Sequence, residues 1–240
     1  MIRSYCILAI VFGLVTPAAA QDVQLPYSFS ERTRDLAFDP ARFFPERAQA
    51  ALSIRYLGDD YGFPVYAIAV RKGCTDADEG VARQTCGGRL TARMVRSPYK
   101  GDPVRPRARG RLLMTSLGQP RNDEDLTRAL DAAGLEWLEA DVRECPSAMA
   151  HLATVRELKF SPSIDLADQP FEFVLHADKI SFEVGDYLMR SRYDGWLKPG
   201  SPAEWANEFA ASLDACWKPS AALVPWRVTK DELATGDVRD

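Results

Sequence analysis

The stretch "VYAIAVRKGCTDADEGVARQTCGGRLTARMV", residues 65–95, places two β-rich segments on either side of a polar connection. Residues 65–70 form an uninterrupted apolar run, and residues 90–95 alternate in the manner of a strand with two distinct faces. Both patterns are typical of strands. We expect the two strands to pair as a hairpin, with Cys74 and Cys86 at the root of its long connection.

The acidic run between these two cysteines raises the question of a redox or metal site. A thioredoxin-like pair has two intervening residues, whereas Cys74 and Cys86 are separated by eleven. Zinc sites use tight pairs such as C-x₂-C, which the chain lacks. Read as a calcium loop, the run has Gly80 one position early and Gly87 where a bidentate glutamate belongs. A disulfide is the expected role, and no cofactor or metal is predicted.

Residues 1–20 have the layout of a cleaved secretory signal peptide. Arg3 precedes an apolar run at 6–15, and small residues follow, so cleavage is expected before Gln21. The apolar run covers about half of the roughly 20 residues that a transmembrane helix needs. We therefore expect residues 21–240 to form one exported domain, periplasmic or secreted, with no membrane span.

Four cysteines remain once Cys6 is removed with the signal peptide, and an oxidising compartment favours their pairing. Four cysteines allow three pairings, among which the sequence alone does not choose. The local structure favours Cys74–Cys86 and Cys145–Cys216. In the chain-entropy model these bonds contribute roughly 3 and 4 kcal/mol to the free energy of unfolding.

The most definite helix begins at Ser201. Ser201-Pro202-Ala203-Glu204 is a capping box with proline at the first helical position. The apolar residues that follow at helical spacing are Trp205, Phe209, Leu213 and Cys216. This stripe predicts a helix that packs against the core.

The remaining chain alternates helical and strand patterns. Helices are predicted near 40–52, over 123–133 after Asn122, and from Pro146 to about 155. Strands are predicted at 135–143, 171–176, 180–184 and 188–193. The ends, 21–36 and 221–240, are predicted to be polar or irregular, apart from residues 223–228. The fold class is therefore α+β, with a mixed or largely antiparallel sheet, several packed helices and two disulfides.

Motifs of the common enzyme classes are absent: G-x-S-x-G, H-E-x-x-H, G-x-x-x-x-G-K-[ST] and G-x-G-x-x-G. Residues 97–100 (SPYK) match S-x-x-K, but the surrounding proline and glycine predict a turn instead of the required helix. Two histidines are available for acid–base chemistry near neutral pH. His151 is expected at the flank of a helix and His176 on the exposed face of a strand, two residues from Asp178. Neither is predicted to be catalytic.

Basic residues are concentrated at 89–111, which carries a net charge of +7 against −12 for the rest of 21–240. The part at 98–110 is rich in proline and is predicted to be an exposed loop. Four arginines spaced two apart lie in and directly after this part: Arg105, Arg107, Arg109 and Arg111. In an extended segment all four lie on one side, where they can bind phosphate or carboxylate groups. The alternative interpretation is that they are solvated or pair with the protein's own acidic residues.

Two hypotheses about function follow. The first is an exported, non-enzymatic protein that binds an anionic envelope polymer or an acidic partner protein through these arginines. The second is an envelope hydrolase that uses carboxylates or His176 in an unrecognised fold. The net charge of −4 argues against a general nucleic-acid binder. An enzyme should show a deep pocket with convergent acid and base groups, whereas a binding protein needs only a basic face.

Overall fold

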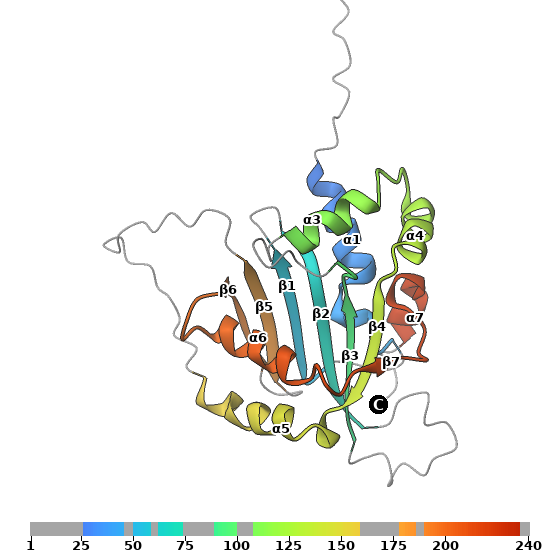
Figure 1. The fold of residues 1–240 in the computed structure, drawn as a ribbon. Helices are drawn as coiled ribbons and strands as arrows, with labels where there is room; N and C mark the ends of the chain where they lie inside the picture. The colour runs from blue at the N-terminus through green and yellow to red at the C-terminus, as the bar shows by residue number, and fades with distance from the viewer. Residues whose placement is uncertain are drawn as a thin grey trace, which may run out of the picture.

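A computed structural model of the chain describes residues 26–45, 50–58, 62–73, 89–99, 108–158, 178–185 and 190–235 (Figure 1). Within these ranges, one antiparallel sheet has the strand order β6-β5-β1-β2-β3-β4-β7. The strands are β1 (Leu52–Gly58), β2 (Phe63–Lys72), β3 (Leu90–Arg96), β4 (Glu136–Asp141), β5 (Lys179–Gly185), β6 (Arg190–Trp196) and β7 (Lys218–Pro219). The predicted α+β class is confirmed, and every pairing in the sheet is antiparallel.

The predicted hairpin forms the centre of the sheet. β2 pairs with β3 so that Ile68 lies opposite Met94 and Val70 opposite Ala92. β1 and β4 flank this hairpin, so the first four strands form a meander. The chain then crosses to the far side of β1, where β5 and β6 extend the sheet.

One face of the sheet is covered by α5 (Pro146–Ala153) and α6 (Pro202–Ser212); in Figure 1, α6 crosses in front of the strands and α5 lies below it. The core between them contains Ile54 and Ile68 from the sheet and Phe209 from α6, all fully buried. The predicted helix start is confirmed, because the Ser201 hydroxyl accepts the Glu204 amide N–H at 3.2 Å; the Glu204 carboxylate accepts the amide N–H of Gly200 and not that of Ser201. The predicted stripe is also confirmed, because Trp205, Phe209 and Leu213 are buried and Cys216 packs against the same cluster.

The Cys145–Cys216 disulfide joins the start of α5 to the residues that follow α6. This bond was predicted, and it closes a separation of 71 residues, for which the chain-entropy model gives about 4 kcal/mol. It is the one disulfide among the described residues. Cys74 and Cys86 lie outside them, as do residues 1–20.

The other face is covered by helices that gather over β2, β3 and β4. They are α1 (Pro26–Ala37), the 3-10 helix η1 (Pro40–Arg42), α3 (Ala108–Ser116), α4 (Asp123–Ala132) and the 3-10 helix η5 (Pro225–Arg227). Phe38, Phe43, Leu113 and Leu126 form this second core against Ala67 and Ala69 of β2. Since β2 is buried on both faces, its apolar run at 65–70 shows no alternation.

Two predictions of irregular structure are wrong. Residues 26–37 form α1, whose apolar pattern is weak because Ser30 and Thr33 are buried alongside apolar residues. The predicted loop at 98–110 gives way at Ala108 to α3. In both cases the contacts with the sheet, and not a clear apolar repeat, stabilise the helix.

Other helix and strand boundaries in the structure differ from the predicted ones by a few residues. The strand predicted at 188–193 is β6, Arg190–Trp196, and that predicted at 135–143 is β4. Leu52, predicted as helical, begins β1, and among the described residues from 40 to 52 the only helix is the short η1. The predicted end at 221–240 contains η5 and the short helix α7 (Lys230–Thr235). The strand predicted at 171–176 lies outside the described residues.

Candidate functional site

Two arginines of the predicted basic segment are engaged within the protein. Arg93 of β3 is 2% exposed; it donates to the Glu139 carboxylate at 2.8 Å and to the Phe43 carbonyl at 2.6 Å. Arg96 donates to Glu136 at 2.6 Å and lies 3.2 Å from an oxygen of Asp214. For these two residues the alternative interpretation, pairing with the protein's own acids, is correct.

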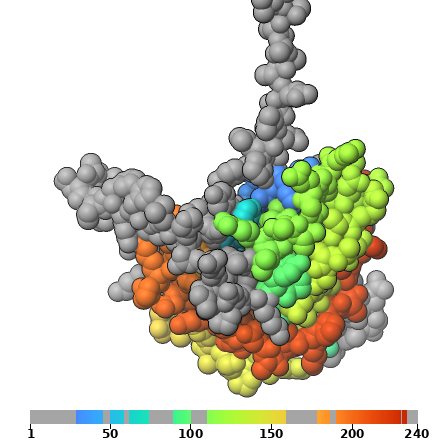
Figure 2. Space-filling view, turned by 45° about the horizontal axis from the view of Figure 1, so that its top comes forward, coloured from blue at the N-terminus to red at the C-terminus, as the bar shows by residue number. Residues whose placement is uncertain are grey.

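The four arginines predicted to contact a ligand are only partly described. Arg105 and Arg107 lie outside the described residues, whereas Arg109 and Arg111 belong to α3. A helical backbone does not keep residues two apart on one side, so the extended arrangement is wrong from Ala108 onward. Figure 2 shows the green residues of α3 and α4 on one side of the surface and the orange residues of β5 and β6 on the opposite side.

The helices leave part of their face of the sheet uncovered. The second core takes its strand residues from β2, β3 and β4, and none of the described residues of β5 or β6 belongs to it. On β6 the side chains alternate, and those that lie on this face are exposed: Arg190, Arg192, Asp194 and Trp196. The uncovered face therefore consists of the polar sides of β1, β5 and β6.

Most charged groups on this uncovered face are held in ion pairs. Arg55 contacts Asp39 of the neighbouring η1 at 2.6 Å, and Lys179 contacts Asp194 at 2.7 Å. Arg190 contacts Glu183. The carboxylates of Asp39, Asp194 and Glu183 therefore each have a cationic partner already. Arg192, which lies opposite Glu183 in the ladder, has no ion-pair partner among the described residues.

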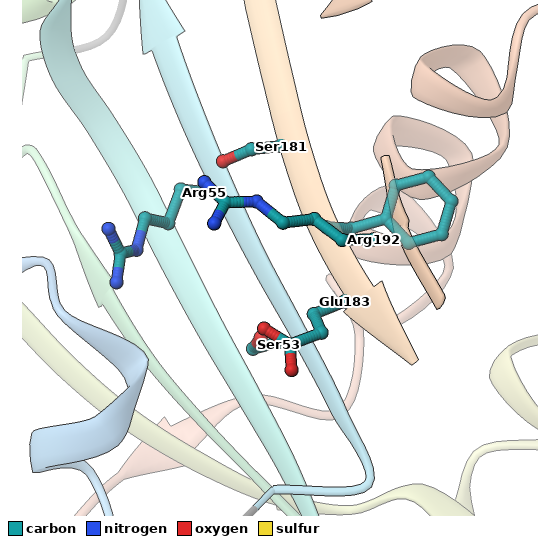
Figure 3. A pocket seen from close by; sticks show the side chains of 6 residues that line it. Ser53, Arg55, Ser181, Glu183 and Arg192 are labelled. Atoms are coloured by element: carbon teal, nitrogen blue, oxygen red, sulfur yellow. The ribbon is translucent and has the colours of Figure 1, made fainter. Parts of the chain in front are cut away.

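Arg192 lies in a shallow hollow of about 100 Å³ on this face. The hollow is lined by Ser53, Arg55, Ser181, Phe182, Glu183 and Arg192. Figure 3 shows Arg192 extending from β6 across β5, with its guanidinium group beside Ser181. The Arg55 guanidinium points the other way, toward its partner Asp39.

This arrangement is suited to binding one small anionic group. A guanidinium group is planar and offers its N–H donors in a fork that matches phosphate or carboxylate oxygens. The side-chain hydroxyls of Ser53 and Ser181 make no hydrogen bond with the described residues, so both are available as further donors. With a volume of about 100 Å³ the hollow is small, which suits a single anionic group.

His151 has a structural role. Its Nε2 lies 2.9 Å from the Trp205 carbonyl oxygen, and its ring stacks on the Trp205 ring with the centroids 5.3 Å apart. Both contacts fix α5 against α6. This agrees with the predicted position at a helix flank. His176 lies outside the described residues.

A second hollow, of about 540 Å³, lies beside the disulfide and the end of β4. Three acidic residues line it: Glu139, Asp141 and Glu144. Glu139 is held by Arg93, and Asp141 accepts the Arg143 amide N–H at 3.0 Å as the cap of the 3-10 helix η3 (Val142–Glu144). Two of the three carboxylates are thus used to hold the fold together.

No group of three or more His, Cys, Asp or Glu side chains that could hold a metal ion occurs among the described residues. In the same part of the chain, no helix has the length and apolar character needed to cross a bilayer. Neither a protein-family model, nor a curated protein, nor a solved structure matches the chain.

The sequence analysis missed this uncovered face. Its one local signal is the alternation of charged residues in "RSRYDGW", residues 190–196. The other members, Ser53 and Ser181, come from strands far apart in the chain. No local pattern connects them with Arg192.

Proposed function

We propose that the chain is an exported, non-enzymatic protein that binds anionic groups of an envelope component through the hollow around Arg192. The observation that carries the proposal is an arginine without an ion-pair partner among the described residues, with the Ser181 hydroxyl beside its guanidinium group and the Ser53 hydroxyl in the same hollow. The signal-peptide pattern at 1–20 supports export. A phosphorylated or carboxylated polymer is the ligand class that these donors suit.

Binding is favoured over hydrolysis by the composition of the hollow. Acid–base hydrolysis of the glycosidase type needs two carboxyl groups that converge on the substrate. The hollow contains one, Glu183, and Arg190 already neutralises it. A hydrolase that uses His176 or another carboxylate pair is the alternative, and none of the contacts described above favours it.

The experiment is a calorimetric titration with inorganic phosphate and with polyphosphate. Arg192→Ser is expected to weaken binding of either probe about tenfold or more, because a hydrogen bond to a charged group contributes roughly 1.5–3 kcal/mol. The matched control is Arg128→Ser, which removes the same charge from an exposed arginine of α4. Affinity for polyphosphate should also fall steeply as salt rises.

A second variant separates the hollow from general surface charge. Ser53→Ala combined with Ser181→Ala keeps every charge and should still weaken binding of phosphate. Equal affinities for the wild type, this variant and Arg192→Ser would refute the hollow as the site. In that case the variant with Arg105, Arg107, Arg109 and Arg111 all changed to serine tests the basic segment, and loss of binding there would relocate the contact.

A further inference from the structure

The two edges of the sheet differ in length. β7, at one edge, has two residues, and one of them is Pro219, which has no N–H to offer to a further strand. β6, at the other edge, has seven residues and contains no proline. A long edge strand is a template for pairing with another chain unless it is blocked.

The direction of the β6 backbone groups follows from its pairing with β5. The Leu197 amide N–H bonds to the Asp178 carbonyl at 2.9 Å, continuing the register in which Tyr193 lies opposite Phe182. Because hydrogen bonding alternates along an antiparallel strand, Ser191, Tyr193 and Gly195 direct their N–H and C=O groups toward β5. The backbone groups that point away from the sheet belong to Arg190, Arg192, Asp194 and Trp196. No described strand pairs with them.

We propose that β6 pairs with β6 of a second copy of this chain, antiparallel and centred on Tyr193. In that register Arg192 lies opposite Asp194 of the second copy, and Asp194 lies opposite Arg192 of the second copy. Arg190 lies opposite Trp196 of the second copy, and Trp196 lies opposite Arg190 of the second copy. A two-fold interface repeats each contact, so one complementary pair becomes two.

The charges select this register over its neighbours. A shift by one residue would oppose outward-pointing backbone groups to inward-pointing ones and remove the hydrogen bonds. A shift by two residues places either Arg192 opposite Arg192 or Asp194 opposite Asp194. Like charges directly opposite each other destabilise a strand pair. The centred register alone combines full overlap with opposite charges.

Two side chains on β6 lack partners that this pairing would supply. Arg192 has no ion-pair partner among the described residues, and Asp194 of the second copy would provide one. Trp196 is 36% exposed on the same face. The guanidinium group of Arg190 from the second copy can cover its ring in a cation–π contact. Asp194 keeps Lys179 beside it, which is compatible with a second cation because a carboxylate accepts several hydrogen bonds.

The test uses sedimentation velocity on the full chain, purified without reductant and in a buffer without multivalent anions. We expect the wild type to dimerise reversibly between about 1 and 300 µM, as is typical of a small interface. Arg192→Asp alone and Asp194→Arg alone should each weaken the dimer about tenfold or more, because both cross-strand pairs become repulsive.

An equimolar mixture of the two single variants provides the matched control. In the mixed dimer every charge at 192 and 194 again faces an opposite charge, so dimerisation should return. Each variant has the same intrachain surroundings alone and in the mixture, so a folding defect cannot produce this recovery. A wild type that stays monomeric throughout the range, a single variant that dimerises as tightly as the wild type, or a mixture that dimerises no more tightly than the single variants would overturn the proposal.

Discussion

Arg93 and Arg192 show how differently two arginines are used in this chain. Arg93 is almost fully buried, and Glu139, the Phe43 carbonyl and the Phe44 ring, 4.5 Å from its guanidinium carbon, surround it. Removing one partner of a buried ion pair strands the other charge, so such an arginine belongs to the fold. Arg192 is exposed and has no ion-pair partner in the described part of the chain. It therefore belongs to a surface that can bind.

Asp131 provides a prediction about pH. The hydrogen bond from Arg227 is the largest of the causes that lower the pKa of Asp131 below its usual value, and the Trp226 indole N–H, at 2.9 Å, also lowers it. A carboxyl whose pKa is lower in the folded state stabilises the protein above its unfolded pKa. That contribution is lost as the pH falls through the folded value.

Asp131→Asn should therefore lower the free energy of unfolding at pH 7 by about 1 kcal/mol, a modest effect because the pair is partly exposed. The difference from the wild type should shrink as the pH falls below the usual range of an aspartate, because the wild-type carboxyl then loses its charge as well. Thermal unfolding at pH 7 and pH 3 measures both. Asp35→Asn, at an exposed position of α1, is the control and should change little at either pH. A difference that grows as the pH falls would contradict this assignment.

The contact between α3 and β2 depends on a glycine. A Cβ atom at Gly110 would lie 2.7 Å from both the Cβ and the carbonyl oxygen of Phe63, a distance at which something must shift. The missing side chain therefore lets the helix approach the backbone of the strand. Gly110 follows a proline-rich segment, and the composition of that segment predicted a loop. The packing role of Gly110 was therefore not predicted from the sequence.

Gly110→Ala distinguishes helix propensity from packing. Propensity alone predicts a gain of about 1 kcal/mol in an exposed helix. The clash with Phe63 predicts a loss of roughly 1–3 kcal/mol, and we expect the loss because one of the two colliding atoms is backbone. Urea unfolding gives the sign directly. Thr115→Ala, at an exposed position of the same helix, should have a small effect, and a stabilised Gly110→Ala variant would show that α3 does not pack this closely.

The uncovered face and the open edge of the sheet meet at β6. Arg192 serves both proposals, because it lines the hollow and also lies opposite Asp194 in the proposed strand pair. Figure 3 shows its guanidinium group beyond β5, on the side of β1 and away from the outer edge. The same side chain cannot occupy both places, so a bound anion and a second copy of the chain are expected to compete.

Phosphate should therefore weaken the dimer. At a phosphate concentration about tenfold above its dissociation constant for the monomer, the dimer dissociation constant should rise by roughly two orders of magnitude, since both copies must release their anion. Sedimentation in phosphate and in sodium chloride of equal ionic strength measures this and controls for screening. If phosphate binds the monomer and leaves the dimer unchanged, Arg192 is not shared.

Local signals were enough to predict several parts of this protein. The apolar run at 65–70 and the alternation at 90–95 predicted the central hairpin, and the capping box at Ser201 predicted α6. The Cys145–Cys216 bond followed from cysteine count and element order. These predictions succeeded because the hydrogen bonds and apolar spacing that specify a strand or a helix lie within a few residues of one another.

The uses of the charged residues could not be predicted in the same way. Arg93 meets Glu139 from 46 positions away, and Arg55 meets Ser181 only because the chain crosses the sheet before β5. The pairing of a charge depends on distances of a few ångströms between distant segments, and composition does not contain them. The basic segment at 89–111 therefore looked like a binding surface while Arg93 and Arg96 were holding the fold. Arg192, which has no ion-pair partner in the described part of the chain, lies in a strand that the sequence predicted but whose place at the edge of the sheet it did not.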